Sequence, residues 1–253
     1  MRNIMCSVTL ILMGFLSMPL YAQQKDHLVA LYSCDNESGN GVIDSSGNGN
    51  NGIFQGGVKR ANGKFKGGLE FNGKDAFIEI PDSKSLTITD GLTVSIWIYL
   101  RNYSSAGGTG FTKGESYKFG TCNTKQIELR STTAGGAWAS NVVYGGTTFP
   151  LNEWHHIAGT YDAVSGNVII YLDGKEDGSG KLSGNITPKT DVAWIGRGAA
   201  PFFDGVYDEV AVWNVPLSQS EILQAMQAIS PIEPSGKLTA TWGEMKSGNI
   251  NGL

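Results

Sequence analysis

The stretch LTVSIWIYL, residues 92–100, alternates aliphatic side chains with polar or aromatic ones. Because successive side chains of a β-strand point to opposite faces, this period of two predicts a strand with its even-numbered residues in a core. The other face carries Trp97 and Tyr99. The same period recurs along most of the chain, whereas a helical period is rare, so the sequence predicts an all-β fold.

Further segments with strand character are separated by turn sequences. We expect strands at residues 28–34, 68–72, 76–80, 126–131, 139–144, 154–161, 167–172, 192–195 and 206–214. The chain has 35 glycines, many of them in Asn-Gly, Asp-Gly and Gly-Gly pairs that are typical of tight turns. Many short strands with frequent turns indicate an antiparallel β-sandwich or jelly roll.

One short helix is expected near the C-terminal end of this pattern. Ser218 and Glu221 have the spacing of a capping box, and Leu217 and Ile222 have that of a hydrophobic staple. Pro231 would end any continuation of the helix.

Length and composition exclude several classes of protein. The chain has 253 residues, of which 40% are hydrophobic and 17% charged, with a formal net charge of −4. A disordered chain would carry more charge, and a nucleic-acid-binding protein would be basic. A β-sandwich of roughly 200 residues needs no second domain.

The first 22 residues have the pattern of a secretory signal peptide. Arg2 precedes an apolar run at residues 4–16, which is too short to span a membrane comfortably, and residues 19–22 resemble a cleavage region. We therefore expect a secreted protein, extracellular or periplasmic, with no transmembrane segment after cleavage. The predicted organisation is a signal peptide at 1–22, one domain at 23–229, and a C-terminal tail of unassigned role at 230–253.

Two cysteines remain once the signal peptide, which contains Cys6, is removed. Cys34 and Cys122 form a disulfide in one interpretation, since the compartment would be oxidising. In the other they are two buried thiols that pack as small hydrophobic side chains.

Taken together and in this order, several stretches resemble the bacterial form of the laminin-G-like domain, a concanavalin A-like jelly roll. They are LYSCD (31–35), DSSGNGNNG (44–52), GLEFNG (68–73), LTVSIWI (92–98), WHHIAGTYD (154–162), YLDG (171–174) and DEVAVW (208–213). The resemblance covers roughly residues 28–227. It implies two antiparallel sheets packed face to face, in a family whose members are mostly binding modules for glycans or proteins.

The resemblance also implies a structural calcium ion at the edge of the sandwich. It places Asp35 near Asp208, with a backbone carbonyl from Gly73 and with Asn48 or Asp44 completing the shell. Alternation along residues 206–214 puts Asp208 on the same face as Val210 and Val212, towards the core, where an uncompensated carboxylate is costly. Calcium would compensate it, since calcium takes hard oxygen ligands. The alternative is that Asp208 accepts backbone N–H bonds without a metal.

Catalysis is not expected. Glycoside hydrolases of this architecture carry paired carboxylates on one strand, and no Glu-x-Asp-x-x-Glu run is present. Glu128 has no acidic neighbour at strand spacing, and the adjacent His155 and His156 would face opposite sides of a strand, which disfavours a zinc site.

Binding remains, with aromatic side chains as the leading candidates. Trp138, Tyr117 and Arg130 are not explained by the fold, and Tyr99 shares the non-aliphatic face of its strand, so these four are the predicted ligand contacts. The main hypothesis is a secreted, non-catalytic module that binds carbohydrate. A module that binds an extracellular protein is the alternative, and a glycoside hydrolase is the third possibility.

Overall fold

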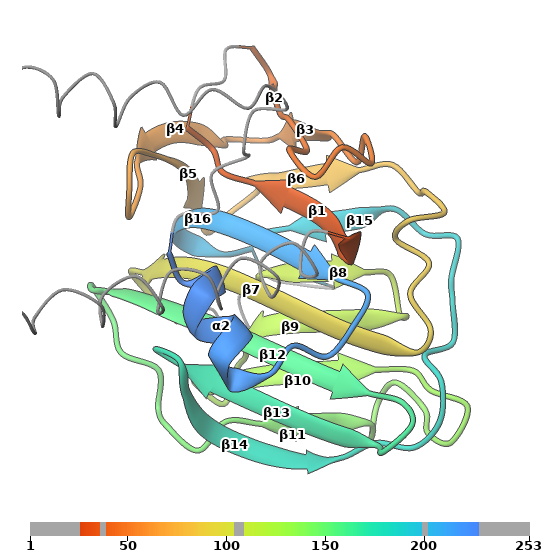
Figure 1. Cartoon of the computed structure of the whole chain (residues 1–253). Helices are drawn as coiled ribbons and strands as arrows, with labels where there is room; N and C mark the ends of the chain where they lie inside the picture. The colour runs from red at the N-terminus through yellow and green to blue at the C-terminus, as the bar shows by residue number, and fades with distance from the viewer. Residues whose placement is uncertain (1–25, 36–38, 104–108, 199–201, 228–253) are drawn as a thin grey trace, which may run out of the picture.

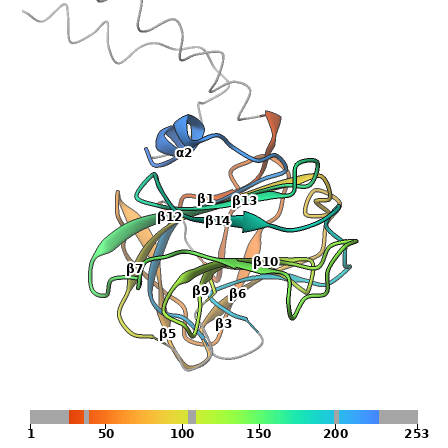
Figure 2. The same ribbon diagram turned by 90° about the horizontal axis from the view of Figure 1, so that it is seen from below.

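The computed structural model of the protein describes residues 26–35, 39–103, 109–198 and 202–227. Within them, two antiparallel sheets pack face to face, and one short helix lies on the outside of one sheet (Figures 1 and 2). The predicted all-β jelly-roll fold is confirmed. The expected signal peptide and the tail at 230–253 lie outside the described residues.

One sheet, here called sheet A, carries the first and last strands of the fold. Its order is β14 (Lys175–Lys181), β13 (Asn167–Leu172), β12 (Trp154–Asp162), β7 (Gly91–Leu100), β16 (Asp204–Trp213), β5 (Gly67–Asn72) and β4 (Lys59–Asn62). β1 (Leu28–Tyr32) also pairs with β16. The stretch quoted first, β7, therefore lies at the centre of the sheet, between β12 and β16.

The other sheet, sheet B, is built from shorter strands. Its order is β11 (Val142–Tyr144), β10 (Ile127–Ser131), β9 (Tyr117–Thr121), β8 (Phe111–Lys113), β15 (Ala193–Ile195), β6 (Phe77–Ile80), β3 (Gly52–Gln55) and β2 (Gly41–Val42). Beyond β11, Gly146 N–H donates to the carbonyl of Asp177 on β14 at 2.7 Å, which joins the two sheets along one edge.

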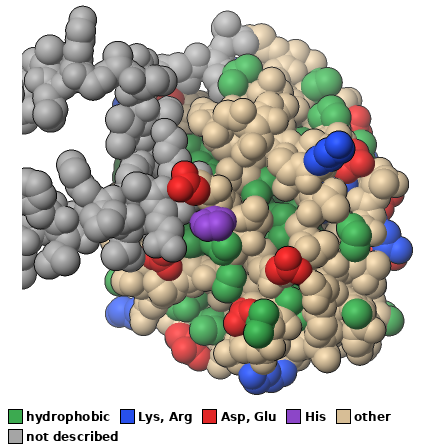
Figure 3. All heavy atoms as spheres, turned by 45° about the vertical axis from the view of Figure 1, so that its right-hand side comes forward, with side chains coloured by type: hydrophobic (Ala, Val, Ile, Leu, Met, Phe, Trp, Pro, Cys, Tyr) green, Lys and Arg blue, Asp and Glu red, His purple; other side chains and the backbone are tan. Residues whose placement is uncertain are grey.

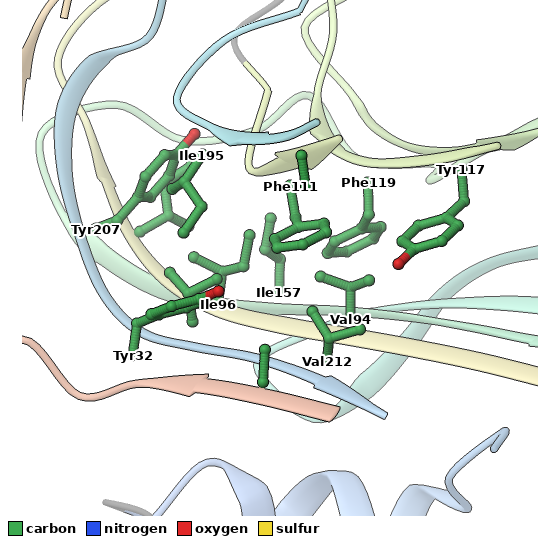
Figure 4. Close-up of a cluster of buried hydrophobic side chains, with 14 of the residues drawn as sticks. Tyr32, Val94, Ile96, Phe111, Tyr117, Phe119, Ile157, Ile195, Tyr207 and Val212 are labelled. Atoms are coloured by element: carbon green, nitrogen blue, oxygen red, sulfur yellow. The ribbon is translucent and has the colours of Figure 1, made fainter. Parts of the chain in front are cut away.

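The core lies between the sheets, as the alternation in β7 predicts. Figure 4 shows Val94 and Ile96 of β7 pointing towards Phe111, Phe119 and other side chains of sheet B, and all four are 0% exposed. The odd-numbered residues of β7 face away from this core, towards the helix.

The helix α2 (Gln219–Ala225) covers the outer face of sheet A (Figure 2). The predicted capping box is present: Ser218 accepts from Glu221 N–H, and the Glu221 carboxylate accepts from Ser218 N–H at 2.7 Å. Ile222 is buried, and the indole N–H of Trp97 donates to the carbonyl of Met226 at 3.1 Å. In the described residues no helix is long and apolar enough to cross a membrane.

The predicted disulfide is not formed. Cys34 follows β1 in sheet A, whereas Cys122 follows β9 in sheet B, and each is a buried thiol. The Cys34 thiol donates to the carbonyl of Tyr32 at 3.4 Å, and the Cys122 thiol donates to the carbonyl of Gln126 at 3.3 Å. The second interpretation, two buried thiols, matches the structure.

Candidate functional site

A row of four side chains crosses the outer face of sheet B. Trp194 of β15 pairs with Thr112 of β8, Thr112 pairs with Lys118 of β9, and Lys118 pairs with Arg130 of β10. Paired residues of neighbouring strands share a face, so the four side chains stand side by side. The row spans three strand spacings, about 14 Å.

A cavity of about 590 Å³ lies over this row. Its wall is completed by residues of four loops, those after β8, β10 and β15 and the one before β15. They are Gly114, Glu115, Trp138, Lys189, Asp191, Val192, Arg197 and Gly198. Charged and aromatic side chains therefore surround one open space.

Glu128 lies beside the row on β10 and is 2% exposed. One of its carboxylate oxygens is 2.5 Å from Nζ of Lys118, and the other is 3.4 Å from the guanidinium of Arg130. A buried carboxylate is stable only with such partners. Glu128 therefore serves as the counter-ion that holds two basic side chains in place.

Arg130 also fixes the loop that carries Trp138. Its guanidinium donates to the carbonyls of Trp138 and Ala139 at 2.8 and 3.0 Å, and it lies 5.9 Å from the centre of the Trp138 ring. The ring itself is half-buried and lines the cavity.

Arg197, at the β15 end of the cavity, is held by aromatic rings. Its guanidinium carbon lies 4.7 Å from the ring centre of Trp194, 4.6 Å from that of Phe77 and 5.6 Å from that of Phe202. These are cation–π distances, and they hold the guanidinium in one place.

Lys113 anchors the rim of the cavity from inside the sandwich. It is 0% exposed, and its ammonium group lies 2.6 Å from a carboxylate oxygen of Asp82. The same group donates to the carbonyls of Lys189, at 3.1 Å, and Asp191. Lys189 and Asp191 line the cavity, so the bonds from Lys113 to their carbonyls fix the position of that part of the cavity wall.

The four predicted ligand contacts fall in three places. Trp138 and Arg130 line the cavity, as described. Tyr99 lies on sheet A, on the opposite side of the molecule, with its ring centre 5.8 Å from that of Trp154. Sequence reasoning did not select Lys118, Arg197 or Trp194 as contacts, because strand pairing brings them together.

Tyr117 is wrong as a ligand contact. It is 0% exposed and points into the core from β9 (Figure 4), where its ring stacks on Phe111 and its hydroxyl donates to the carbonyl of Leu86 at 3.1 Å. Burial raises the pKa of the Tyr117 hydroxyl well above its ordinary value. The signal that was missed is alternation: Tyr117 and Phe119 face inward, and Lys118 between them faces outward.

The acidic residues Asp35 and Asp208 are neighbours, as the resemblance implied. Both bind the turn at residues 63–67: Asp208 accepts from the N–H groups of Lys64 and Phe65 at 2.9 and 3.1 Å, and Asp35 accepts from Gly67 N–H at 3.2 Å. Burial, aided by the charge of Asp35 and opposed by the backbone donors, raises the pKa of Asp208 to about 6.

Asp208 does not point into the core, contrary to the alternation argument. A β-bulge between Asp208 and Ala211 shifts the register of β16 on β7, with Glu209 at φ +48°. Asp208 pairs with Trp97, whose side chain is on the outer face, while Val210 lies in the core after the bulge. A bulge reverses the alternation on one side of it.

The remaining predicted calcium ligands lie elsewhere. Gly73 follows the far end of β5, beside Asp204, and Asn48 donates to the carbonyls of Leu28 and Val29. Asp44 accepts backbone N–H bonds within its own loop and from Leu31. The described residues contain no group of three His, Cys, Asp or Glu side chains placed to hold a metal.

The two adjacent histidines differ in environment. His156 is 0% exposed on the outer face of sheet A, with Nε2 2.7 Å from the Ser95 hydroxyl, and burial lowers its pKa to about 3. His155 is half-buried and is bonded through Nδ1 to Asp173 at 2.8 Å. The side chains do not converge on one ligand.

A family comparison identifies the relatives of this chain. Residues 72–223, more than half of the sequence, match the model of the concanavalin A-like lectin/glucanases superfamily. The chain belongs to this superfamily. Its laminin-G-like members are the ones that the sequence motifs resembled. A search of curated protein sequences gave no match.

Solved structures show the same lectin-like sandwich. The binding domain of Paraclostridial Mosquitocidal Protein 1 has 16% identity and a TM-score of 0.65, with 80% of this chain and 52% of that one covered. The receptor-binding domain of botulinum neurotoxin C/D mosaic serotype has 15% identity and a TM-score of 0.64, with 81% and 52% covered. This chain thus spans about half the length of those toxin domains.

A third structure matches over nearly its whole length. Domain 4 of AbnA, an extracellular arabinanase from Geobacillus stearothermophilus, was solved in complex with arabinotriose. It has 23% identity and a TM-score of 0.59, with 79% of this chain and 98% of that domain covered. At these identities the likeness establishes the fold of this superfamily member.

Proposed function

We propose that this protein is a carbohydrate-binding module whose ligand occupies the cavity on the outer face of sheet B. The observation that carries the proposal is the composition of that cavity. It combines an accessible tryptophan, Trp138, with fixed hydrogen-bonding side chains such as Arg130 and Lys118. Sugars present both apolar ring faces and hydroxyl groups, so they need this combination.

The dimensions of the site support a short oligosaccharide. A volume of about 590 Å³ falls within the range of small-ligand pockets. The row of side chains from Trp194 to Arg130 is about 14 Å long, which suits a linear ligand lying across the strands. The buried pair of Glu128 and Lys118 holds the polar groups in position before the ligand arrives.

The related structures support the same class of function. Domain 4 of AbnA carries an arabinotriose, and the two toxin relatives are a binding domain and a receptor-binding domain. We infer binding without hydrolysis for this chain. The carboxylate next to the row, Glu128, has both oxygens next to cations, so it is engaged as a structural counter-ion rather than as an acid or nucleophile.

A protein ligand is the alternative, and the surface gives it less support. Figure 3, turned by 45° from the view of Figure 1, shows a face other than the outer face of sheet B, and there hydrophobic side chains are scattered among polar and charged ones rather than gathered in one broad patch. Protein-binding surfaces usually have an apolar centre. Export from the cell is part of the proposal and rests on the signal-like sequence of residues 1–22.

The test is binding of the purified protein to an array of neutral and acidic oligosaccharides. We expect specific binding that Trp138→Ala reduces about fivefold or more, since stacking on an aromatic ring is worth about 1–3 kcal/mol in nucleobase recognition. Tyr99→Ala is the matched control, because it removes an aromatic side chain from the opposite face. Thermal unfolding checks that both variants fold.

The two variants separate the two faces of the sandwich. Loss of binding in Tyr99→Ala with retention in Trp138→Ala would move the site to sheet A and refute the cavity as the ligand site. No binding to any oligosaccharide by folded protein would refute carbohydrate recognition and favour a protein partner.

We also propose a structural calcium ion bound by Asp35 and Asp208. Two neighbouring carboxylates repel each other, and a divalent cation removes that cost. The carbonyl of Cys34 packs against Gly67 beside them and supplies a third hard oxygen. Gly73 and Asn48 were predicted to complete the shell. Gly73 lies beyond the far end of β5 and Asn48 beside the start of β1, so neither is near Asp35 and Asp208. The ion would join the first strand to the last, a role in stability.

A further inference from the structure

We propose that the ligand is an acidic saccharide, with the carboxylate of a uronic acid residue bound by Arg197. This inference rests on the proposed carbohydrate function and assigns the class of sugar. It comes from how charge is distributed among the side chains that line the cavity.

The basic side chains at the β10 end of the cavity already have a carboxylate partner. Lys118 and Arg130 share the buried carboxylate of Glu128, at 2.5 and 3.4 Å. One guanidinium nitrogen of Arg130 also donates to two carbonyl groups, those of Trp138 and Ala139. This end of the cavity therefore offers polar contacts to neutral hydroxyls.

At the β15 end the guanidinium of Arg197 has no counter-ion within the described part of the chain. Among the described residues it makes no hydrogen bond or ion pair, and its contacts are the rings of Trp194, Phe77 and Phe202. The side chain is half-buried, so water replaces a partner only in part. An anion supplied by a ligand would compensate this charge.

Neighbouring groups at the same end lack partners as well. The indole N–H of Trp194 and the hydroxyl of Thr112 are buried, and neither has a hydrogen-bond partner among the described residues. Lys189 on the rim is exposed, so water solvates its charge. The acidic residues of the wall, Glu115 and Asp191, are exposed, so water solvates their charges without a ligand.

The guanidinium of Arg197 suits a carboxylate, the anionic group of acidic sugars. The guanidinium lies among aromatic rings and has no hydrogen-bond partner in the described part of the chain, so its N–H groups can pair with the two oxygens of a planar carboxylate. In a uronic acid this carboxylate is attached to a pyranose ring. The rest of the oligosaccharide would lie along the row towards Trp138 and the β10 end.

The experiment compares acidic oligosaccharides with their uncharged methyl esters by calorimetry. Three pairs cover the common backbones: trimers of galacturonate, of mannuronate, and of a glucuronate-containing repeat. For at least one pair we expect the acid to bind about tenfold more tightly than its ester, the effect of one charge-assisted hydrogen bond. That preference should shrink at high salt.

Arg197→Gln should abolish the preference for the acid over its ester. The matched control is Arg60→Gln, the same change at an exposed position on β4 of the other sheet, which should keep the preference. Acid and ester binding equally in all three pairs would overturn the inference, as would a preference that survives Arg197→Gln.

The failures of the two proposals can be told apart. One outcome is that acid and ester bind equally, with both lost in Trp138→Ala. That result would support carbohydrate binding at the cavity and refute only the preference for an acidic saccharide. If the folded protein binds no acid, no ester and no neutral oligosaccharide of the array, both proposals are refuted.

Discussion

Trp97, Asp208 and His156 stand next to one another on the outer face of sheet A, on three adjacent strands. Each is almost completely buried although this is not the side that faces the other sheet. Helix α2 and the turn at residues 63–67 cover them. At the scale of single residues, the second buried layer of the protein therefore contains polar, titratable side chains beside its apolar cluster.

His156 makes the stability of the protein depend on pH. Its pKa is lowered to about 3 by burial, with Asp173 opposing, while an unfolded histidine titrates near 6.5. Between these values the unfolded state binds the extra proton, so stability is lost as pH falls from about 6.5 towards 3. The greatest slope for one proton is about 1.4 kcal/mol per pH unit.

Urea denaturation at a series of pH values from 7 to 4 measures this slope. We expect His156→Gln to show a shallower loss of unfolding free energy in that window than the unmodified protein. His27→Gln, at the start of β1, controls for the removal of a histidine as such. Parallel profiles for the protein and His156→Gln would contradict the assignment.

Sequence patterns predicted single residues well only where the alternation was regular. Val94 and Ile96 face the core as expected, because β7 pairs with β12 without a register shift from Gly91 to Tyr99. Asp208 does not follow the alternation, because the bulge at Glu209 interrupts it. No hydrophobic pattern signals a bulge, since the side chains on both sides of it remain apolar.

At the scale of elements, α2 is the part with the clearest local signal. It has seven residues, which is too short to be stable alone, so its cap and its packing on sheet A determine whether it forms. Leu217 and Ile222 are buried against Trp213, at 4%, 0% and 2% exposure. Loss of the cap should therefore loosen the cover over this face.

Ser218→Ala tests the capping box. We expect a loss of about 1 kcal/mol in unfolding free energy, the usual cost of removing an N-cap side chain. Denaturant unfolding gives the value, with Ser179→Ala on the exposed part of β14 as the control. An unfolding curve for Ser218→Ala that overlays the parent curve would show that the cap contributes nothing.

Several strands could not be predicted from local sequence. β14, with the sequence KEDGSGK, is an edge strand that has no apolar side chain and two glycines, so only its pairing with β13 reveals it. β4, with the sequence KRAN, is similar. The cavity depends on such pairing: Trp194, Thr112, Lys118 and Arg130 are adjacent through register alone, although they span residues 112–194.

At the scale of the whole molecule, the two ends of the fold are joined side by side. β1 pairs with β16 from Leu28 opposite Trp213 to Tyr32 opposite Val210. Beyond Tyr32, Asp35 and Asp208 both contact the turn at 63–67. A cation at this point would connect the start of the fold to its end, which is why the calcium proposal predicts an effect on global stability.

Thermal unfolding of chelator-treated protein with and without calcium tests that proposal. At a calcium concentration about 100 times the dissociation constant, the unfolding temperature should rise by roughly 5–10 °C. Asp208→Asn should abolish the rise, whereas Asp26→Asn, an exposed change before β1, should keep it. Equal unfolding temperatures for the parent protein in calcium and in chelator would refute the ion.

The pairing of β1 with β16 has a further consequence for how the module can be displayed. Both ends of the described fold, His27 before β1 and Met226 after α2, belong to the sheet A side, whereas the cavity opens on the outer face of sheet B. A tether attached at either end would leave the binding face pointing away from the anchor. Copies joined in tandem through these ends would be free to engage one polysaccharide together, and their avidity would then exceed the affinity of a single site.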